Sequence, residues 1–229
     1  FTKGANRIAI VDVTRENKID EIGIRGVPAI FNPAWSPDGR RIAFTGTVDG
    51  ISDLYVYDFE SGITDRVTHD MESNIHPSWS PDGRYLAFSQ EIINNIPGKR
   101  RFSFDLALMD MKTRDVRRLD VFPGAWNVNP VFSKDGLSVY FLSDADGFRN
   151  LYKYKTGDGT VKKLTEYLTG ISGITPFSPA ISTARDKGTV VYTYYTGNTY
   201  QLWAAGEDQF SERTADKNIV NFDAGTLPP

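Results

Sequence analysis

The sequence predicts an all-β protein, a β-propeller built from four-stranded antiparallel blades. One reason is a repeated string, NPAWSPDGR at residues 32–40 and HPSWSPDGR at residues 76–84, with weaker copies that begin at Asn129 and Ser178. Another reason is that each copy is followed by β-rich runs separated by turn residues. Self-similarity with a period of about 40 to 50 residues is typical of stacked supersecondary units, and a propeller blade is a unit of that length.

Length and composition indicate a globular protein without nucleic-acid or membrane chemistry. A repeat fold can use all 229 residues, of which 24% are charged and 13% aromatic. The net charge of −3 gives no overall attraction to nucleic acid or to an anionic membrane, so we expect neither as a partner. No apolar run is long enough to span a bilayer, and the absence of Cys excludes disulfides and thiolate chemistry. Because the chain begins at Phe1 without a Met or a signal-peptide pattern, we expect a mature or excised segment.

The first full blade is predicted over residues 31–70. Its first strand opens at Pro33, which is tolerated there because proline has no N–H to give to a ladder. Pro37-Asp38-Gly39 has the residues that a tight turn requires. The runs that follow predict three more strands in hairpin order, at residues 41–48, 54–59 and 64–69.

The same pattern predicts three further full blades and two partial ends. The full blades are 76–120, 127–166 and 178–214; the last has expected strands at 178–182, 189–196, 200–205 and 210–214. Residues 1–26 are predicted as a partial blade with strands at Arg7–Val13 and Ile19–Ile24, and the tail 215–229 offers one possible strand, Asn218–Phe222. The two ends could complete one blade and close a five-bladed ring. We instead expect a ring of more than five blades, most simply six, with further strands outside this segment, because one tail strand closes at most a three-stranded blade. Residues 1–229 alone should then be aggregation-prone or open-ended.

Large apolar side chains recur at one equivalent position of the four units. This position is filled by Trp35, Trp79, Phe132 and Ile181. Since neighbouring blades of a propeller bury their faces against one another, we expect these side chains in the core between blades rather than in a binding platform.

The repeat resembles a known family. The WSPDG string, followed by the runs around Leu54–Asp58 and Arg66–Thr68, is similar to the WD40-like β-propeller repeat of the TolB family. Related repeats occur in the propeller domains of prolyl-oligopeptidase-like and tricorn-type proteases. The resemblance covers about residues 1–214 and weakens in the last two units, where residues 132–136 lack the proline and residues 181–188 form a longer turn. It implies a six-bladed, TolB-like group and a bacterial protein of the cell envelope, periplasmic or otherwise extracytoplasmic.

Catalytic and metal-binding patterns are absent from the sequence. The only two histidines, His69 and His76, cannot be assembled by spacing into a zinc site or a catalytic triad, so we expect no enzyme activity, no metal and no cofactor in this segment. The loop that begins at Asp144 has the D-x-D-G start of a calcium loop. Its twelfth position is Lys155, however, where an EF-hand needs a bidentate Glu, so a simple turn is the preferred interpretation.

The irregular loops predict a binding surface at one end of the propeller. In a four-stranded blade, the hairpin between the second and third strands and the connection to the next blade emerge at the same end. The long segments 92–103, 120–128 and 166–177 are of these two kinds, and functional residues concentrate on such loops. The candidate residues for a protein partner, which could also be another domain of the same chain, are His76, Lys99, Arg100, Arg101, Trp126, Asn127, Asn129, Tyr167 and Phe177. Trp126 could alternatively fold down as a plug on the core.

Three functions follow as hypotheses. The first is a non-enzymatic protein-interaction or scaffolding propeller. The second is an accessory propeller of a larger hydrolase or peptidase that gates or orients substrate, which the similarity of residues 170–180 to propellers that follow zinc-peptidase-like domains also suggests. The third is small-ligand or sugar binding at the channel mouth, where Asn32, His76 and Asn129 begin equivalent inner strands.

Overall fold

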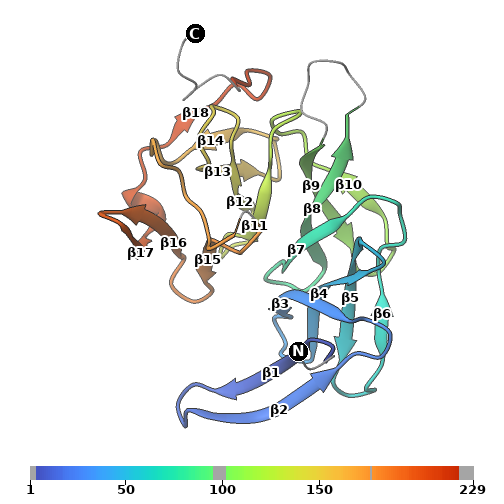
Figure 1. The fold of residues 1–229 in the computed structure, drawn as a ribbon. Coiled ribbons are helices and arrows are strands. Elements are labelled where there is room, and N and C mark those ends of the chain that lie inside the picture. The colour runs from blue at the N-terminus through green and yellow to red at the C-terminus, as the bar shows by residue number, and fades with distance from the viewer. Residues whose placement is uncertain (1–3, 95–101, 176, 222–229) are drawn as a thin grey trace.

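The computed structural model describes residues 4–94, 102–175 and 177–221. It confirms the predicted all-β propeller: antiparallel sheets stand side by side as four blades, and the chain passes from one blade to the next (Figure 1). A single turn of 3-10 helix, η1 (Glu207–Gln209), accompanies the strands. The strands of the first three blades are β3 (Ala29–Trp35), β4 (Arg41–Val48), β5 (Ile51–Asp58), β6 (Thr64–Arg66), β7 (Asn74–Trp79), β8 (Tyr85–Ile93), β9 (Phe102–Asp110), β10 (Val116–Arg118), β11 (Val128–Phe132), β12 (Ser138–Ser143), β13 (Asn150–Lys155) and β14 (Val161–Lys163).

The two strands predicted near the start of the chain form a separate pair. β1 (Arg7–Asp12) and β2 (Asn17–Gly23) are antiparallel to each other and make a two-stranded sheet. Ile8 and Ile22 point from this pair into a small core with Ile42 and Phe44 of the first blade. The pair and the described part of the tail do not complete one blade between them, because the last described strand joins the third blade instead.

Each tight turn after an inner strand is held by a local network of hydrogen bonds. In the first blade the Ser36 hydroxyl donates to the Asp38 carboxylate at 2.6 Å, and the same carboxylate accepts from the Arg40 N–H at 3.1 Å. The second turn repeats this arrangement around Asp82. The third turn keeps it as well, with Ser133 donating to Asp135, although Lys134 stands where the first two turns have proline. The turn network therefore depends on serine and aspartate and does not require the proline.

The core between blades contains most of the repeated apolar positions. Trp79, Phe132 and Ile181 are buried, as predicted. Trp35 is not: 51% of its surface is exposed, and it stacks on Phe59. The physical reason lies in the contact that buries Trp79, whose indole N–H donates to the Ala34 carbonyl on the inner strand of the preceding blade. The described residues before β3 form only β1 and β2 and offer no such inner strand.

The fourth blade differs from the prediction. It has three strands, β15 (Ile181–Ala184), β16 (Thr189–Thr196) and β17 (Thr199–Ala205). The strand expected at residues 210–214 is reduced to β18 (Arg213–Thr214), which pairs with β14 and becomes the fifth strand of the third blade. η1 (Glu207–Gln209) lies between them.

A buried lysine explains this change of partner. Lys153 on β13 has a side chain that is 8% exposed, and its ammonium group pairs with Glu207 and Glu212. Burial acts to lower the pKa of Lys153, but the hydrogen bonds to the two glutamates outweigh it and raise the pKa. A buried charge is costly unless it is paired, so these contacts hold the segment on the third blade.

The rest of the tail continues across the outside of the second and third blades. The segment 206–221, called the strap below, pairs Lys217 with Asp120, and the N–H of Asn221 donates to the Ala145 carbonyl at 2.6 Å. The possible strand at Asn218–Phe222 is not formed over its described residues, 218–221. No helix in the described part of the chain is long and apolar enough to cross a membrane.

Candidate functional site

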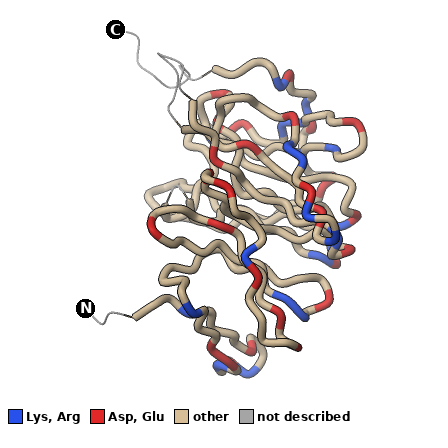
Figure 2. The backbone as a smooth tube through the Cα atoms, turned by 90° about the vertical axis from the view of Figure 1, so that its right-hand side faces the viewer, with Lys and Arg blue, Asp and Glu red and all other residues tan. Residues whose placement is uncertain are grey.

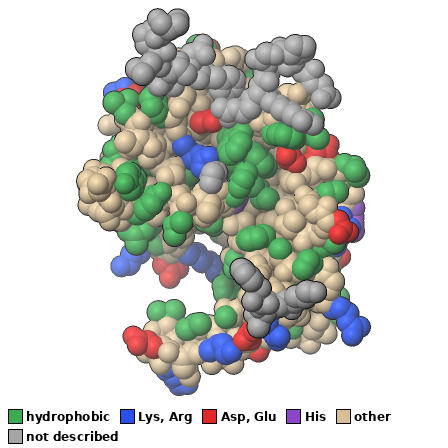
Figure 3. All heavy atoms as spheres, in the orientation of Figure 1, with side chains coloured by type: hydrophobic (Ala, Val, Ile, Leu, Met, Phe, Trp, Pro, Cys, Tyr) green, Lys and Arg blue, Asp and Glu red, His purple; other side chains and the backbone are tan. Residues whose placement is uncertain are grey.

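Three irregular loops meet at one end of the propeller, as the connection pattern predicts. The Trp126 indole N–H donates to the Phe102 carbonyl at 3.1 Å, which joins the first and second of the long segments in space. The Trp126 ring stacks on Phe177 with ring centres 5.5 Å apart, and Phe104 packs edge-on against both rings. Figure 3 shows hydrophobic side chains gathered near the middle of the face seen in Figure 1. The segment predicted as a loop at 92–103 is shorter than expected, because β8 extends to Ile93 and pairs with β9 from Phe102.

Trp126 lies in the position of a plug on the core. Its ring contacts Phe104, which is 4% exposed, and its backbone N–H donates to the Asp144 carboxylate at 2.8 Å. The Arg149 guanidinium lies over the same ring, 5.9 Å from its centre. Phe177, 47% exposed, covers the plug from outside, so the aromatic surface offered to solvent is mainly that of Phe177.

Asn127 holds the loop before the third blade in place. Its side chain is fully buried and donates from the same amide nitrogen to the carbonyls of Phe104 and Phe122, at 3.0 and 2.8 Å. The amide oxygen accepts from the Ser143 hydroxyl at 2.8 Å. These three hydrogen bonds link β9 of the second blade, the connecting segment and β12 of the third blade, and the side chain has no surface with which to meet a ligand.

His76 connects the inner strand of the second blade to the loop that carries Phe177. The side chain is buried, and Nε2 lies 2.8 Å from the Phe177 carbonyl, which can only accept, so the neutral imidazole has its proton on Nε2. Nδ1 is buried without a hydrogen-bond partner among the described residues. Burial lowers the pKa of His76 to about 4; the hydrogen bond to Phe177 opposes this shift and the charge of Arg149 adds to it.

The residues before three inner-strand prolines share an unusual backbone conformation. Asn32, His76 and Asn129 have φ of 52°, 58° and 56°, in the left-handed region. Each lies at a shift in the pairing of the inner strand with its neighbour. Asparagine and histidine are enriched in this conformation, whereas a residue before proline is usually extended. Asparagine or histidine directly before these prolines is therefore a sequence signal for the bulge.

Asn129 uses its side chain to hold the next blade. Its amide oxygen accepts from the backbone N–H groups of Ala180 and Ile181 at 2.6 and 3.1 Å. Of the three residues proposed to line a sugar site, two therefore already have protein partners, and only Asn32 has no side-chain hydrogen bond among the described residues.

The four inner strands enclose a central cavity of about 380 Å³. Its lining contains no Asp or Glu, and its two cationic residues donate to backbone carbonyls: Lys134 to Asp186, and Arg185 to Pro37 at 2.6 Å. The Arg185 contact links the fourth blade to the first across the end of the cavity that carries the tight turns. The cavity lining therefore carries two cationic side chains, each hydrogen-bonded to a backbone carbonyl, and no anionic side chain.

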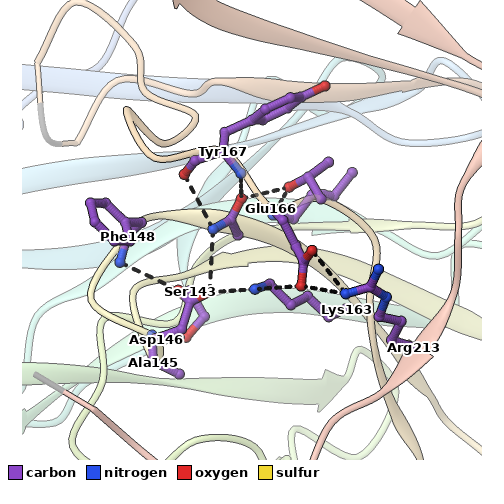
Figure 4. Close-up of polar contacts among 11 residues, drawn as sticks. Ser143, Ala145, Asp146, Phe148, Lys163, Glu166, Tyr167 and Arg213 are labelled. Atoms are coloured by element: carbon purple, nitrogen blue, oxygen red, sulfur yellow. Dashed lines mark hydrogen bonds and ion pairs between the residues drawn. The ribbon is translucent and has the colours of Figure 1, made fainter. Parts of the chain in front are cut away.

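The loop considered for calcium is occupied by a lysine. Lys163 bonds the Asp146 carboxylate at 2.6 Å and also contacts Glu166, which accepts two bonds from Arg213 (Figure 4). An ammonium group thus stands where a cation would have to bind, which agrees with the interpretation of this loop as a turn. The described residues contain no group of three or more His, Asp or Glu side chains that could hold a metal ion.

Tyr167 lies beside the network around Lys163 and Asp146, and not beside the stacked rings of Trp126 and Phe177. Its backbone N–H donates to the Asn150 side chain at 2.8 Å, and its hydroxyl bonds that of Tyr192 at 2.9 Å. The remaining predicted binding residues, Lys99, Arg100 and Arg101, lie outside the described residues. The structure thus brings His76, Trp126 and Phe177 together. The side chains of Asn127 and Asn129 instead form hydrogen bonds between neighbouring blades.

Comparisons with known proteins agree with this architecture. Residues 1–92 match the family model of the TolB beta propeller domain. No curated protein sequence matches the chain. TolB from Acinetobacter baumannii has a similar structure, with a TM-score of 0.71 and 22% identity over 93% of this chain and 49% of that protein. For TolB of Agrobacterium tumefaciens, described as putative, the TM-score is 0.69 and the identity 20%, over 87% of this chain and 69% of that one.

Similarity also extends to propellers of a different kind of protein. A puromycin-hydrolyzing peptidase from Mycobacterium tuberculosis matches with a TM-score of 0.62 and 15% identity, over 85% of this chain and 33% of the peptidase. At these identities the structural matches establish the fold alone. The chain spans about half the length of the Acinetobacter TolB.

Proposed function

We propose that this chain is a non-enzymatic protein-interaction propeller of the bacterial cell envelope, and that its partner binds at the loop-bearing end. The observation that carries the proposal is the stacked pair of Phe177 and Trp126. Phe177 exposes 47% of its surface above a plug, Trp126, that is itself hydrogen-bonded to Phe102 at the start of β9. Exposed aromatic residues on a rigid scaffold are typical of the centres of protein interfaces.

The aromatic pair is held in place before any partner arrives. His76 binds the carbonyl of Phe177, and Asp144 binds the N–H of Trp126. Side chains that are already ordered lose little conformational freedom on binding, so more of the contact energy appears as affinity. A location in the periplasm or elsewhere outside the cytoplasm is part of the proposal and rests on the TolB match of residues 1–92.

Replacing Phe177 by alanine is expected to weaken partner binding at least tenfold and to change thermal stability little. The ring is half-exposed and anchors the surface, and an anchor of this kind is worth about 1.4 kcal/mol or more. A photoreactive phenylalanine analogue at position 177 would first trap the partner in the cell envelope. The affinity of the purified partner for wild type and variant would then be measured by titration calorimetry.

Val116 provides the matched control, because it is 45% exposed on the outer strand of the second blade, away from the loops. Val116→Ala should bind like wild type, and the photoreactive residue at 116 should trap nothing in common with position 177. If Phe177→Ala and a variant with all three loops shortened both kept full affinity, the proposed face would be wrong.

The second candidate is an accessory propeller of a larger hydrolase or peptidase. It is supported by the similarity to one third of the Mycobacterium tuberculosis peptidase and by the central cavity, through which an extended substrate could be oriented. The sequence on either side of this segment distinguishes the two candidates: a zinc-peptidase or serine-hydrolase motif there favours the accessory role.

A third candidate, small-ligand or sugar binding at the channel mouth, is supported only by Asn32 and the polar groups near it. Thermal-shift measurements with saccharides and divalent ions test it directly. If none of them raised the melting temperature, small-ligand or sugar binding at the channel mouth would be rejected.

A further inference from the structure

One position near the start of the third strand of each blade has a hydrogen-bonded side chain in the first and third blades. In the first blade it is Asp53 on β5, which accepts from the Arg66 guanidinium at 2.5 Å and from the Thr68 hydroxyl at 2.9 Å. In the third blade it is the neutral Asn150 on β13, which accepts from the Thr165 hydroxyl at 2.9 Å. In both blades a threonine that follows the outer strand thus supplies a donor to this position.

The second blade departs from this pattern. Asp105 on β9 occupies the position, and Asp120 stands where the other two blades have threonine. One ionised carboxylate cannot donate a hydrogen bond to another, and Asp120 instead pairs with Lys217 of the strap. Burial raises the pKa of Asp105, and the charge of Arg118 opposes this shift. Within the described part of the chain, the Asp105 carboxylate has neither a hydrogen-bond donor nor an ion-pair partner.

Three more carboxylates lie near Asp105 at the loop-bearing end. Gln90 lies opposite Asp105 in the sheet and donates to the Asp70 carboxylate at 2.9 Å. The next residue along β8, Glu91, bonds the connection that enters the blade, because its carboxylate accepts from the Ser73 N–H at 3.3 Å. None of the four carboxylates forms an ion pair with a described residue. They are called the acidic patch below and consist of Asp70, Glu72, Glu91 and Asp105, all half-buried.

Asn74 adds a further acceptor to the acidic patch. Its side chain is 0% exposed, and its amide nitrogen donates to the Asp70 carboxylate at 2.6 Å and to the Glu72 carbonyl at 3.0 Å. Its amide oxygen has no hydrogen-bond partner among the residues that the structure describes. Buried polar atoms are normally paired, so this oxygen and the carboxylates offer more acceptors than the described chain fills. A Lys or Arg side chain matches them, since it carries positive charge and several N–H donors.

The acidic patch adjoins the aromatic pair of the proposed interface. Glu91 lies opposite Phe104, whose ring packs edge-on against Phe177. Apolar side chains accompany the carboxylates: Met71 in the connection is 79% exposed, and Ile93 at the end of β8 is 51% exposed. The surface thus combines an aromatic centre with apolar residues and unpaired negative charge beside it.

The outer side of the blades has a different charge pattern. Figure 2, which views the side of the molecule that faces right in Figure 1, shows cationic and anionic residues interspersed. On the first two blades, Arg114 pairs with Asp65 and Arg84 pairs with Asp110. The unpaired negative charge of the acidic patch is therefore a local feature, and not only a consequence of the net charge of −3.

We propose that the partner of the loop-bearing end is cationic: Lys or Arg side chains of a protein segment bind the acidic patch, while an apolar side chain of the same segment contacts Phe177. The inference rests on the function proposed above, because it describes the chemistry of the partner at that face. Complementary charges at the rim of an interface mainly set specificity and association rate, and each exposed pair contributes little. We therefore expect the acidic patch as a whole to select the partner.

Neutralising the acidic patch tests the proposal. The triple variant Glu72→Gln, Glu91→Gln and Asp105→Asn keeps the shape of each side chain. The probe is a short fluorescent peptide made of the repeat Lys-Lys-Leu-Phe, with a Glu-Glu-Leu-Phe peptide for comparison, and binding is followed by anisotropy. The variant should bind the cationic peptide about tenfold more weakly, because three contacts worth about twofold each multiply. The affinity of wild type should fall as salt is added, and that of the variant should fall less.

A second triple variant removes the same net charge at the opposite end of the blades. Glu60→Gln, Asp115→Asn and Asp186→Asn change exposed residues in the hairpins at the tight-turn end, and this variant should bind the peptide like wild type. Melting curves of both variants check folding. If the first is unstable, Glu72→Lys gives the same test at a side chain without a described hydrogen bond. Equal weakening by the two triple variants would overturn the proposal, as would a wild type that binds both peptides equally or binds neither.

Lys99, Arg100 and Arg101 provide a test of opposite sign. They lie between β8 and β9 in the sequence, outside the described residues. A cationic partner gains nothing from these charges, so replacing all three by alanine should leave the affinity for the cationic peptide unchanged or increase it. A weaker affinity would contradict a cationic partner.

Phe177→Ala separates this inference from the proposed function. If Phe177→Ala weakens peptide binding and neutralising the acidic patch does not, the proposed face is right and the cationic partner is wrong. If only the neutralised variant binds more weakly, the acidic patch is right and the aromatic centre is wrong. Both changes should also reduce the yield of the partner that a photoreactive residue at position 93 traps in the cell envelope.

Discussion

Asn127→Asp is expected to lower the free energy of unfolding by about 4 kcal/mol or more, the largest effect that we predict for a single substitution. The aspartate is close to isosteric, but it loses the amide nitrogen that donates to the carbonyls of Phe104 and Phe122. It also places a carboxylate in a site where the asparagine side chain is fully buried, facing two carbonyl oxygens. Chemical denaturation followed by tryptophan fluorescence measures the loss.

Asn198→Asp makes the same chemical change where it should have little effect. Asn198 is an exposed turn residue with a φ of 67°, a conformation that aspartate also adopts. We expect its free energy of unfolding to stay within about 0.5 kcal/mol of wild type. If both variants lost the same amount of stability, the hydrogen bonds of Asn127 would not be what joins the second and third blades.

Acidification is expected to cost about 3 kcal/mol of stability through His76 alone. Its pKa in the folded protein is about 4, because the ring is buried, against an unfolded value near 6.5. At a pH above 6.5 both states are neutral. As the pH falls from 6.5 to 4, the unfolded state takes up a proton that the folded state does not, so stability declines across this window and the loss is complete below the folded pKa. Denaturation curves at half-unit steps of pH measure this slope.

His76→Asn separates this contribution from the rest of the acid response. Asparagine occupies the equivalent left-handed positions 32 and 129, so the backbone should accept it. The variant should show a flatter profile between pH 6.5 and 4. It should keep the further loss at lower pH from carboxylates such as Asp38 and Asp82, whose pKa values are lowered mainly by hydrogen bonds from serine hydroxyls. A variant with the same slope as wild type would show that another group dominates the response.

The blades and their turns were predictable from the sequence because the interactions that form them are local. In each of the first three tight turns, the serine hydroxyl and the aspartate carboxylate bond groups that are only a few residues away. The convergence of Trp126 and Phe177 was also predictable in outline. It follows from which ends of the strands the connections join, and the contacts between the two rings then depend on packing.

Several predicted site residues make structural hydrogen bonds that a single sequence does not display. Asn127 and Asn129 were candidates for binding because they lie in loops or begin an inner strand. Their side chains bond backbone groups of neighbouring blades, and those partners are identified only when the blades are placed side by side. The left-handed conformation of His76 and its equivalents was signalled by residue type, but its contact with Phe177 spans 101 positions in the chain.

The sequence by itself determined the repeat, the hairpin order and the tight turns, since each depends on hydrogen bonds and turn conformations within a few residues. Only the tertiary structure decided which edge the last strand joins and which apolar faces are covered. Residues 210–214 could extend either the third or the fourth blade. The buried ammonium group of Lys153 settles the choice by requiring Glu207 and Glu212 nearby. Trp35 and Leu202 occupy repeat positions whose counterparts are buried, yet both are exposed, because burial depends on a neighbouring strand or blade and not on the residue itself.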